Sequence, residues 1–282
     1  MRIHAIQTGT VAIKSRQREG VGRGARRLVN TFVDRAWTEP LPIYAFAVEH
    51  PEGVLVVDTG ETARATEPDY FPRWHPYFRF GVREWVEPEQ EIGSQLERLG
   101  IAPRDVKKLV LTHMHTDHAG GLGHFPHTEI LLSRTELALA SGRRGRLRGY
   151  LNNRWPAWFD PTPVDLPPTA LGPFPQSLAL TESGDVSLVP LPGHTPGHIG
   201  VVVREDDHVV LLAGDTAYSQ ELMMRGAIDG VAPDEAAARL TIERIQLQCK
   251  ETPTVYLVAH DPETGARLAE RRPVAIPPQQ PA

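Results

Sequence analysis

The stretch that decides the fold is Thr112-His113-Met114-His115-Thr116-Asp117-His118-Ala119-Gly120-Gly121, which places three histidines and an aspartate within six residues. In extended backbone, alternate side chains share a face, so the imidazoles of His113 and His115 can converge on one metal ion. Asp117 and His118 are displaced from that pair, in the turn that begins the next predicted helix, and can reach a second ion. Neutral imidazoles and a carboxylate suit zinc or a similar divalent cation. The stretch therefore predicts a metal centre.

Three more residues of ligand type stand at the ends of predicted strands. His194 lies in a turn-rich segment after a strand over 185–191, Asp215 ends an apolar run, and His260 closes the last strand. Ligands in layered α/β proteins gather at the carboxyl ends of strands. Each of these residues, taken alone, is explained equally well by a structural role and by metal binding. Together with the first cluster, they complete two coordination shells.

These residues resemble the His-x-His-x-Asp-His pattern of the metallo-β-lactamase superfamily, and the likeness covers roughly residues 40–265. The resemblance implies an α/β fold, a four-layer αβ/βα sandwich of two mixed β-sheets flanked by helices. It also implies two divalent metal ions per chain, zinc by preference, with cobalt, manganese or iron as alternatives. The ligand sets that it implies are His113, His115 and His194 for one ion and Asp117, His118 and His260 for the other, with Asp215 and a hydroxide between them.

Within the superfamily, Tyr218 favours one branch. It follows Asp215 by three residues, as in the N-acyl homoserine lactonases, where a tyrosine hydrogen-bonds the substrate. True zinc β-lactamases typically carry cysteine where this chain has Asp215. The resemblance thus implies a lactonase that opens a lactone ring by attack of the bridging hydroxide, with Asp117 passing a proton to the leaving alkoxide. A core tyrosine is the alternative for Tyr218.

Rival functions share the same ligands. A glyoxalase II-like thioesterase and an organophosphate or aryl-ester hydrolase would use the same scaffold, and a non-catalytic metal sensor belongs to another class. Asp58 is predicted to orient a ligand histidine, or else to cap a turn. His198 is left open between a supporting and a structural role. The other histidines are expected at the surface or in packing: His4, His50, His75, His124, His127 and His208.

Composition excludes several classes. The chain has 282 residues, 40% hydrophobic and 23% charged, with a formal charge of −5, which does not indicate a nucleic-acid binder. A basic cluster over 143–148 is interpreted as a solvated loop.

No apolar run is long enough for a membrane span, and no signal peptide is evident, so we expect a cytoplasmic protein without a membrane partner. The single Cys249 is expected to be a buried thiol. A homodimer is an expectation from the family alone.

The chain is predicted to form one metallo-β-lactamase-like domain over 1–272, with a disordered tail over 273–282. Residues 14–42 are predicted to be a long surface loop or arm, and 142–177 a proline- and aromatic-rich insertion near the site. The aromatic residues at 70–85 and 155–174 are expected to wall an acyl-chain pocket, form a dimer interface, or pack in the core. The predicted strands are a pair within 1–13, and 43–49, 53–58, 106–111, 128–132, 185–191, 199–204, 208–213 and 254–259; the predicted helices are 89–99, 133–141 and 232–250.

Overall fold

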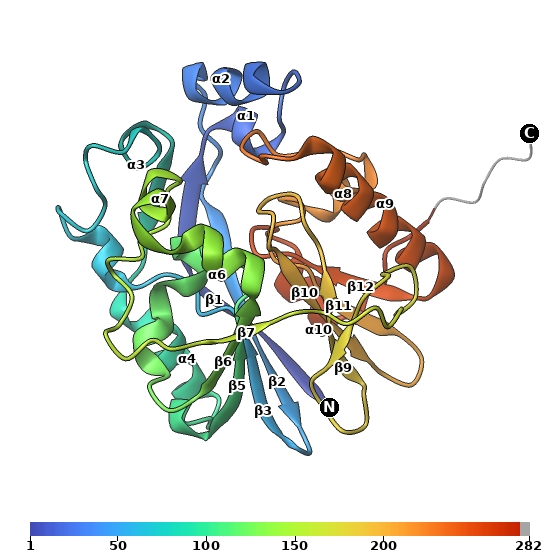
Figure 1. The fold of residues 1–282 in the computed structure, drawn as a ribbon. Coiled ribbons are helices and arrows are strands. Elements are labelled where there is room, and N and C mark those ends of the chain that lie inside the picture. Colours follow the sequence, from blue (N-terminus) through green and yellow to red (C-terminus); the bar gives the residue numbers. More distant parts are fainter. Residues whose placement is uncertain (277–282) are drawn as a thin grey trace, which may run out of the picture.

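The computed structural model describes residues 1–276 and contains two facing β-sheets with helices on their outer sides (Figure 1). The first sheet has seven strands in the order β4-β1-β2-β3-β5-β6-β7. The strands β4, β1, β2 and β3 pair antiparallel, and β3, β5, β6 and β7 pair parallel. Their bounds are β1 (Arg2–Ile13), β2 (Leu41–His50), β3 (Gly53–Val57), β4 (Val82–Trp85), β5 (Val106–Val110), β6 (Glu129–Ser133) and β7 (Thr162–Val164).

The second sheet has five strands in the order β12-β11-β10-β9-β8. Only β11 and β12 pair parallel, whereas β10 runs antiparallel to both β9 and β11. The strands β9, β11 and β12 therefore point the same way and end at one edge. Their bounds are β8 (Leu178–Ala179), β9 (Val186–Pro190), β10 (Ile199–Arg204), β11 (Val209–Leu212) and β12 (Thr254–Leu257).

Helices cover the outer face of each sheet, with α4 and α6 beside the first sheet and α8 and α9 beside the second (Figure 1). The bounds are α1 (Ser15–Arg18), α2 (Ala25–Val33), α3 (Pro76–Phe80), α4 (Ile92–Arg98), α5 (Thr116–Ala119), α6 (Arg134–Ala140), α7 (Gly142–Leu147), α8 (Gln220–Met224), α9 (Glu235–Glu251) and α10 (Thr264–Ala269). Among residues 1–276, no helix is both long and apolar enough to cross a bilayer.

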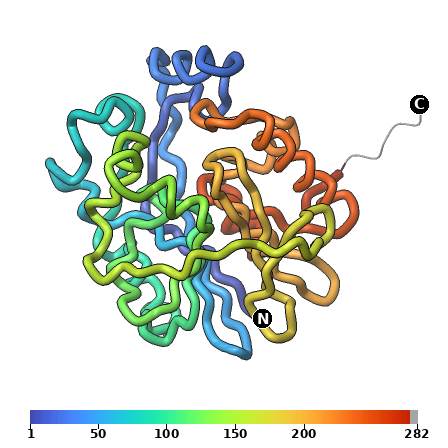
Figure 2. Tube along the Cα trace, viewed as in Figure 1, coloured from blue at the N-terminus to red at the C-terminus, as the bar shows by residue number. Residues whose placement is uncertain are grey.

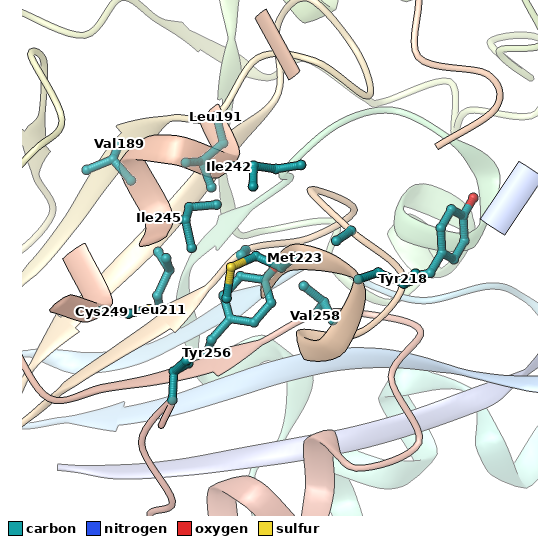
Figure 3. Packing of buried hydrophobic residues seen from close by; sticks show 14 of the residues in the cluster. Val189, Leu191, Leu211, Tyr218, Met223, Ile242, Ile245, Cys249, Tyr256 and Val258 are labelled. Carbon is teal, nitrogen blue, oxygen red and sulfur yellow. The ribbon is translucent and has the colours of Figure 1, made fainter. Parts of the chain in front are cut away.

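Three apolar clusters hold the layers together. The first lies between the sheets, where Phe46 and Val57 meet Leu188 and Val201. The second packs α4 against the outer face of the first sheet, and the third packs α8 and α9 against the second. Figure 3 shows the third cluster around Tyr256, with Tyr218 at its margin and the phenol oxygen directed away from the other labelled side chains. The predicted four-layer αβ/βα sandwich is confirmed.

Residues 1–13 form one long strand, so the predicted strand pair is wrong. The strand pairs with β2 along its length and with β4 at its end, and its register shifts between Gln7 and Thr10. Gly9 lies in this irregularity with a φ of 138°, and a Cβ there would lie 2.7 Å from the carbonyl oxygen of Trp85. The glycine lets one strand bend where the sequence pattern indicated a turn.

The segment 14–42 contains α1, α2 and the start of β2, so it is not a loop, although most of residues 15–36 are exposed or half-buried at the surface. Helix α2 buries Arg27 and Thr31 and exposes its apolar residues, so its pattern is not that of a core-facing helix. Residues 142–177 contain α7 and β7 and then cross from the first sheet to the second (Figure 2). Both segments pack on the fold.

Smaller differences concern element ends. The predicted helix 89–99 is a 3₁₀ turn over Pro88–Gln90 followed by α4. Val274 is buried, and its N–H donates to the carbonyl of Thr254 at 2.9 Å, so the beginning of the predicted disordered tail packs against β12. The rest of that tail, 277–282, lies outside the described residues.

Candidate metal centre

The predicted ligands follow the carboxyl ends of four strands. The 113–118 cluster follows β5 of the first sheet, while His194, Asp215 and His260 follow β9, β11 and β12 of the second. Because these ends meet at one edge of the sandwich, residues up to 147 positions apart come together. His113 and His115 lie just beyond the strand, and His118 lies in α5, which begins at Thr116.

Three imidazoles form the first group. Nδ1 of His115 lies 3.0 Å from Nε2 of His113 and 3.0 Å from Nε2 of His194. Ligand nitrogens of a tetrahedral zinc site are separated by about 3.3 Å, given zinc–nitrogen bonds of about 2.0–2.1 Å. The three rings thus present a set of nitrogens close enough to bind one ion.

A second group combines carboxylates with imidazoles. Nε2 of His260 lies 3.3 Å from an oxygen of Asp117 and 3.3 Å from an oxygen of Asp215. Asp215 also lies 3.2 Å from Nε2 of His118 and 3.6 Å from Nε2 of His194. Asp215 therefore contacts metal-ligand nitrogens of both the first and the second group, as a carboxylate shared by two metal ions would.

Two buried atoms in this cluster test whether the residues fit metal ions. Nε2 of His118 and Oδ1 of Asp215 are buried and lie 3.2 Å apart, and among residues 1–276 neither makes a well-aligned hydrogen bond. Buried polar atoms without such a bond cost free energy. A divalent cation would satisfy both, so the donor set fits the metal ions that the superfamily implies.

The charges of the two groups differ. Burial and the neighbouring histidines lower the pKa of His113 well below its usual range and that of His115 to about 3, so both rings are neutral, as ligands must be. Burial alone would also lower the pKa of His260, yet Asp215 and Asp117 raise it to about 10. In the metal-free chain the two carboxylates therefore hold a proton on His260, and a divalent cation bound there would take the place of that proton.

Asp58 orients His118, as predicted. Its Oδ2 lies 2.8 Å from Nδ1 of His118, which leaves Nε2 directed at the second group. The same carboxylate accepts from the backbone N–H and hydroxyl of Thr112 at 2.7 and 2.9 Å. One carboxylate therefore both orients His118 and holds the segment that follows β5.

Three further contacts support the ligands. Asp229 lies 3.1 Å from Nδ1 of His194, and Nδ1 of His260 donates to the carbonyl of Pro42 at 2.8 Å. Nε2 of His198 accepts from the backbone N–H of Asp215 at 3.1 Å, so His198 supports the site. No sequence motif marks Asp229, which is identified only by its position beside His194.

A cavity of about 620 Å³ opens over the cluster. Asp117, Asp215, His260 and Tyr218 line its floor, and apolar side chains line its walls. The arm over 14–42 and residues 147–150 both contribute to these walls. His75, which was expected to be a surface or packing residue, also lines the cavity and hydrogen-bonds the carbonyl of Leu147 at 3.3 Å.

Gln17 is the residue of the cavity that sequence reasoning missed most clearly. It is buried, and its Nε2 donates to the hydroxyl oxygens of Tyr77 at 3.0 Å and Tyr218 at 3.1 Å. Tyr218 also stacks on His260, with ring centroids 5.4 Å apart. Gln17 belongs to the segment predicted to be a surface arm, so nothing in the sequence pointed to it.

The two predicted aromatic groups have different positions. In the first, over 70–85, Tyr77 and Phe78 line the cavity. In the second, over 155–174, Trp155 and Phe159 pack against the core beside the first sheet, and Phe174 is fully buried. The first group is thus partly a pocket wall and the second is mainly core packing.

Comparison with known proteins agrees with this geometry. The family model described as the metallo-beta-lactamase superfamily matches residues 38–260. An N-acyl homoserine lactonase of Bacillus cereus is 28% identical over 232 residues, covering 79% of this chain and 82% of that protein. The N-acyl homoserine lactonase AttM of Rhizobium radiobacter is 24% identical over 289 residues, covering 95% and 96%.

Solved structures share the fold. An N-acyl homoserine lactone hydrolase with N-hexanoyl-L-homoserine at its catalytic metal center superposes with a TM-score of 0.73 at 22% identity, covering 98% of this chain and 97% of that one. AidC, a dizinc quorum-quenching lactonase, gives 0.64 at 16% identity, covering 93% and 88%. The family match, the sandwich and the His/Asp cluster at its edge agree, and the chain belongs to the metallo-β-lactamase superfamily.

Proposed function

We propose that this chain is a dinuclear-metal hydrolase that opens the lactone ring of N-acyl homoserine lactones or related lactones. The observation that carries the proposal is that Tyr218 and the ligand cluster line one cavity. The names of the relatives from Bacillus cereus and Rhizobium radiobacter support the same substrate class.

His113, His115 and His194 would hold one ion, and Asp117, His118 and His260 the other, with Asp215 shared. Zinc is the proposed metal, because imidazole and carboxylate donors suit it. Two divalent cations at such a site supply Lewis-acid polarisation of a carbonyl and an activated water nucleophile near neutral pH.

Tyr218 would donate a hydrogen bond to the substrate carbonyl or to the developing alkoxide. Burial and the negative charge of Asp215 raise its pKa well above the usual range, so the phenol keeps its proton. Because Gln17 donates to the phenol oxygen, the O–H of Tyr218 is free to point at the substrate. Donors fixed in this way favour the transition state.

Asp117 would carry the proton. Although burial alone raises its pKa, His118 and His260 hold it at about 2, so the carboxylate is ionised. Its place in the cavity beside Tyr218 would let it pass a proton to the leaving alkoxide. The apolar cavity wall, which includes Phe78, Leu28 and Phe32, would receive an acyl chain.

Substrate comparison tests the proposal. Purified protein of measured metal content is assayed with acyl homoserine lactones, simple γ-lactones, S-lactoylglutathione and paraoxon. We expect lactones to be turned over fastest and His115→Ala to lose most of the activity. Lactone turnover no better than that of His115→Ala refutes the lactonase assignment, and a preference for the thioester or paraoxon selects a rival hydrolase.

The Tyr218→Phe variant tests the narrower role. Removing the hydroxyl should lower turnover about 10-fold or more while metal content stays unchanged, because the ring still stacks on His260. Steady-state kinetics with metal analysis measure both quantities. An unchanged rate removes Tyr218 from the mechanism.

The sequence predictions of a cytoplasmic location and a homodimer belong to the proposal as well. Both rest on composition and on the family likeness. Fractionation of cells and sedimentation analysis of the purified chain test them directly.

A further inference from the structure

Charge is divided unevenly along this chain. The segments 14–35, 72–83 and 141–154 together hold 15 arginine and lysine residues against two acidic ones, whereas the remainder holds 15 against 33. A net charge of −5 conceals this asymmetry. We call these three segments the rim, because residues from each of them line the cavity over the ligand cluster.

Exposed apolar side chains concentrate in the same three segments. Among residues 1–276, fourteen large apolar side chains are exposed, and eight of them belong to the rim. The most exposed are Leu147 at 68%, Val33 at 62% and Trp74 at 60%. Apolar side chains scattered singly are ordinary, but a concentration around one cavity marks an interaction surface.

Helix α2 is the clearest case, because its polar residues face inward. Arg27 donates to the carbonyl of Ala232 and lies 3.8 Å from Glu235, and Thr31 donates to the carbonyl of Arg16 at 3.2 Å. These contacts leave Val29 and Val33 facing outward, while the partly exposed Leu28 and Phe32 line the mouth of the cavity.

The rim segments are adjacent in space. Phe32 and Val33 share a groove with Arg79 and Phe80. The ring of His75, next to Trp74, hydrogen-bonds the carbonyl of Leu147. In Figure 1, α2, α3 and α7 gather at the same end of the molecule. Most rim arginines are exposed: Arg16, Arg23, Arg26, Arg35, Arg73, Arg79, Arg83, Arg143, Arg144, Arg146, Arg148 and Arg154.

We propose that the rim docks this protein onto an anionic lipid bilayer, with the cavity mouth facing the headgroups. Arginines would bind the lipid phosphates, while the apolar side of α2 and the aromatic side chains beside it would enter the boundary between headgroups and acyl chains. This contact is peripheral, since no helix among residues 1–276 can span a membrane, and it would replace the expectation from composition that the protein has no membrane partner.

The charge of the rim favours an anionic bilayer over two other binding partners, a second copy of the chain and a nucleic acid. A second copy of the chain docked rim to rim would bring two strongly basic surfaces together, which repel each other. A nucleic acid would satisfy the arginines but would leave the apolar side of α2 without a partner. An anionic bilayer matches both properties.

Vesicle sedimentation with the full, metal-loaded chain tests the proposal. We expect binding to vesicles of phosphatidylcholine with about 30% phosphatidylglycerol, weaker binding at high salt, and no binding to phosphatidylcholine alone. The triple variant Arg143→Gln, Arg144→Gln, Arg146→Gln should lose about 100-fold in partitioning, at about fivefold per arginine. The variant Val29→Ser, Val33→Ser should lose about 10-fold or more.

Matched controls lie elsewhere on the surface. Leu240→Ser with Leu247→Ser removes two exposed apolar side chains of α9, and Arg104→Gln removes an exposed arginine, so both should bind vesicles as the unchanged chain does. The measurement needs no substrate, so its result is independent of the proposed lactonase activity.

Several results would overturn the proposal. One is that the chain does not bind anionic vesicles, and another is that the rim variants bind them as well as the unchanged chain does. A third is a concentration-dependent dimer that the rim variants abolish. Tighter binding to duplex DNA than to vesicles, insensitive to the Val29 and Val33 changes, would assign the rim to nucleic acid instead.

Discussion

Gln17 illustrates how one side chain can control another that performs chemistry. Its amide lies between the hydroxyls of Tyr77 and Tyr218, and it is buried. A phenol that already accepts one hydrogen bond keeps its own proton for a second partner. Gln17 is thus a positioning residue, acting on substrate only through Tyr218.

The Gln17→Leu variant should lower lactone turnover by roughly five- to tenfold, because the hydroxyl of Tyr218 loses the donor that orients it. Steady-state kinetics of the metal-loaded enzyme measure the effect. In the Tyr218→Phe background the same substitution should have no further effect, since the group that it orients is gone.

Gln95→Leu serves as the matched control, because the amide of Gln95 donates to the carbonyl of Gln7, away from the cavity. Its turnover should be unchanged. If losses from Gln17→Leu and Tyr218→Phe are simply additive, Gln17 acts independently of Tyr218 and the positioning role is wrong.

At the scale of elements, helix α9 fixes the segment that carries His194. Asp234 begins the helix by accepting from the N–H groups of Ala236 and Ala237, and Thr241 donates to the carbonyl of Pro192 at 2.6 Å. Gly193 lies against the helix with a φ of 154°, and a Cβ there would lie 2.5 Å from Cα of Ala238. The glycine therefore allows the close approach that positions His194.

The Gly193→Ala variant should lose about 2–4 kcal/mol of stability, from backbone strain and overpacking against α9. Metal affinity should fall with it, because His194 is displaced. Denaturant unfolding and metal titration measure the two effects. Gly123→Ala is the control, since a Cβ there meets nothing within 4 Å; equal losses in the two variants would contradict the packing argument.

At the scale of the whole molecule, the ligand cluster joins the two sheets. His113 and its neighbours follow a strand of the first sheet, and Asp215 and His260 follow strands of the second. Ions bound between them would link the sheets and stabilise the folded chain. Ligands bound at about 1,000 times their Kd contribute about 4 kcal/mol.

Chelation should therefore lower the midpoint temperature of thermal unfolding on the order of 10 °C, when the metal had been present at about 1,000 times its Kd.

The increase in this midpoint temperature on adding metal should be larger at pH 8 than at pH 6.5. In the metal-free chain the pKa of His260 is about 10 and that of His118 is raised as well, so metal must displace their protons. For each proton that metal binding releases, the metal affinity rises by up to about tenfold when the pH increases by one unit.

Calorimetry of unfolding with and without a chelator, at both pH values, measures this dependence. A metal-dependent gain that is equal at the two pH values, or larger at pH 6.5, would mean that these imidazoles are already neutral. A midpoint insensitive to chelation would contradict the linkage of the two sheets by metal.

The sequence by itself brought forward the seven ligand-type residues and most of the strands, because each of these features leaves a local signal, and the resemblance carried by those residues implied the sandwich. Apolar runs mark buried strands, and a ligand-type residue after such a run marks a strand end. The strand beginning at Val106 and the helix ending at Glu251 were thus found nearly in place. Segments without that signal were not, such as the helix that exposes Val29 and Val33.

Only the tertiary structure decided which groups support the site. Gln17 and Tyr218 are 201 residues apart, and His194 and Asp229 are 35 apart. No spacing rule joins such pairs, because their meeting depends on how the segment before β2 and the loop before α9 pack over the strand ends. The rim has the same origin: its charges and apolar side chains are scattered over three segments, and the packing of those segments around one cavity makes them a single surface.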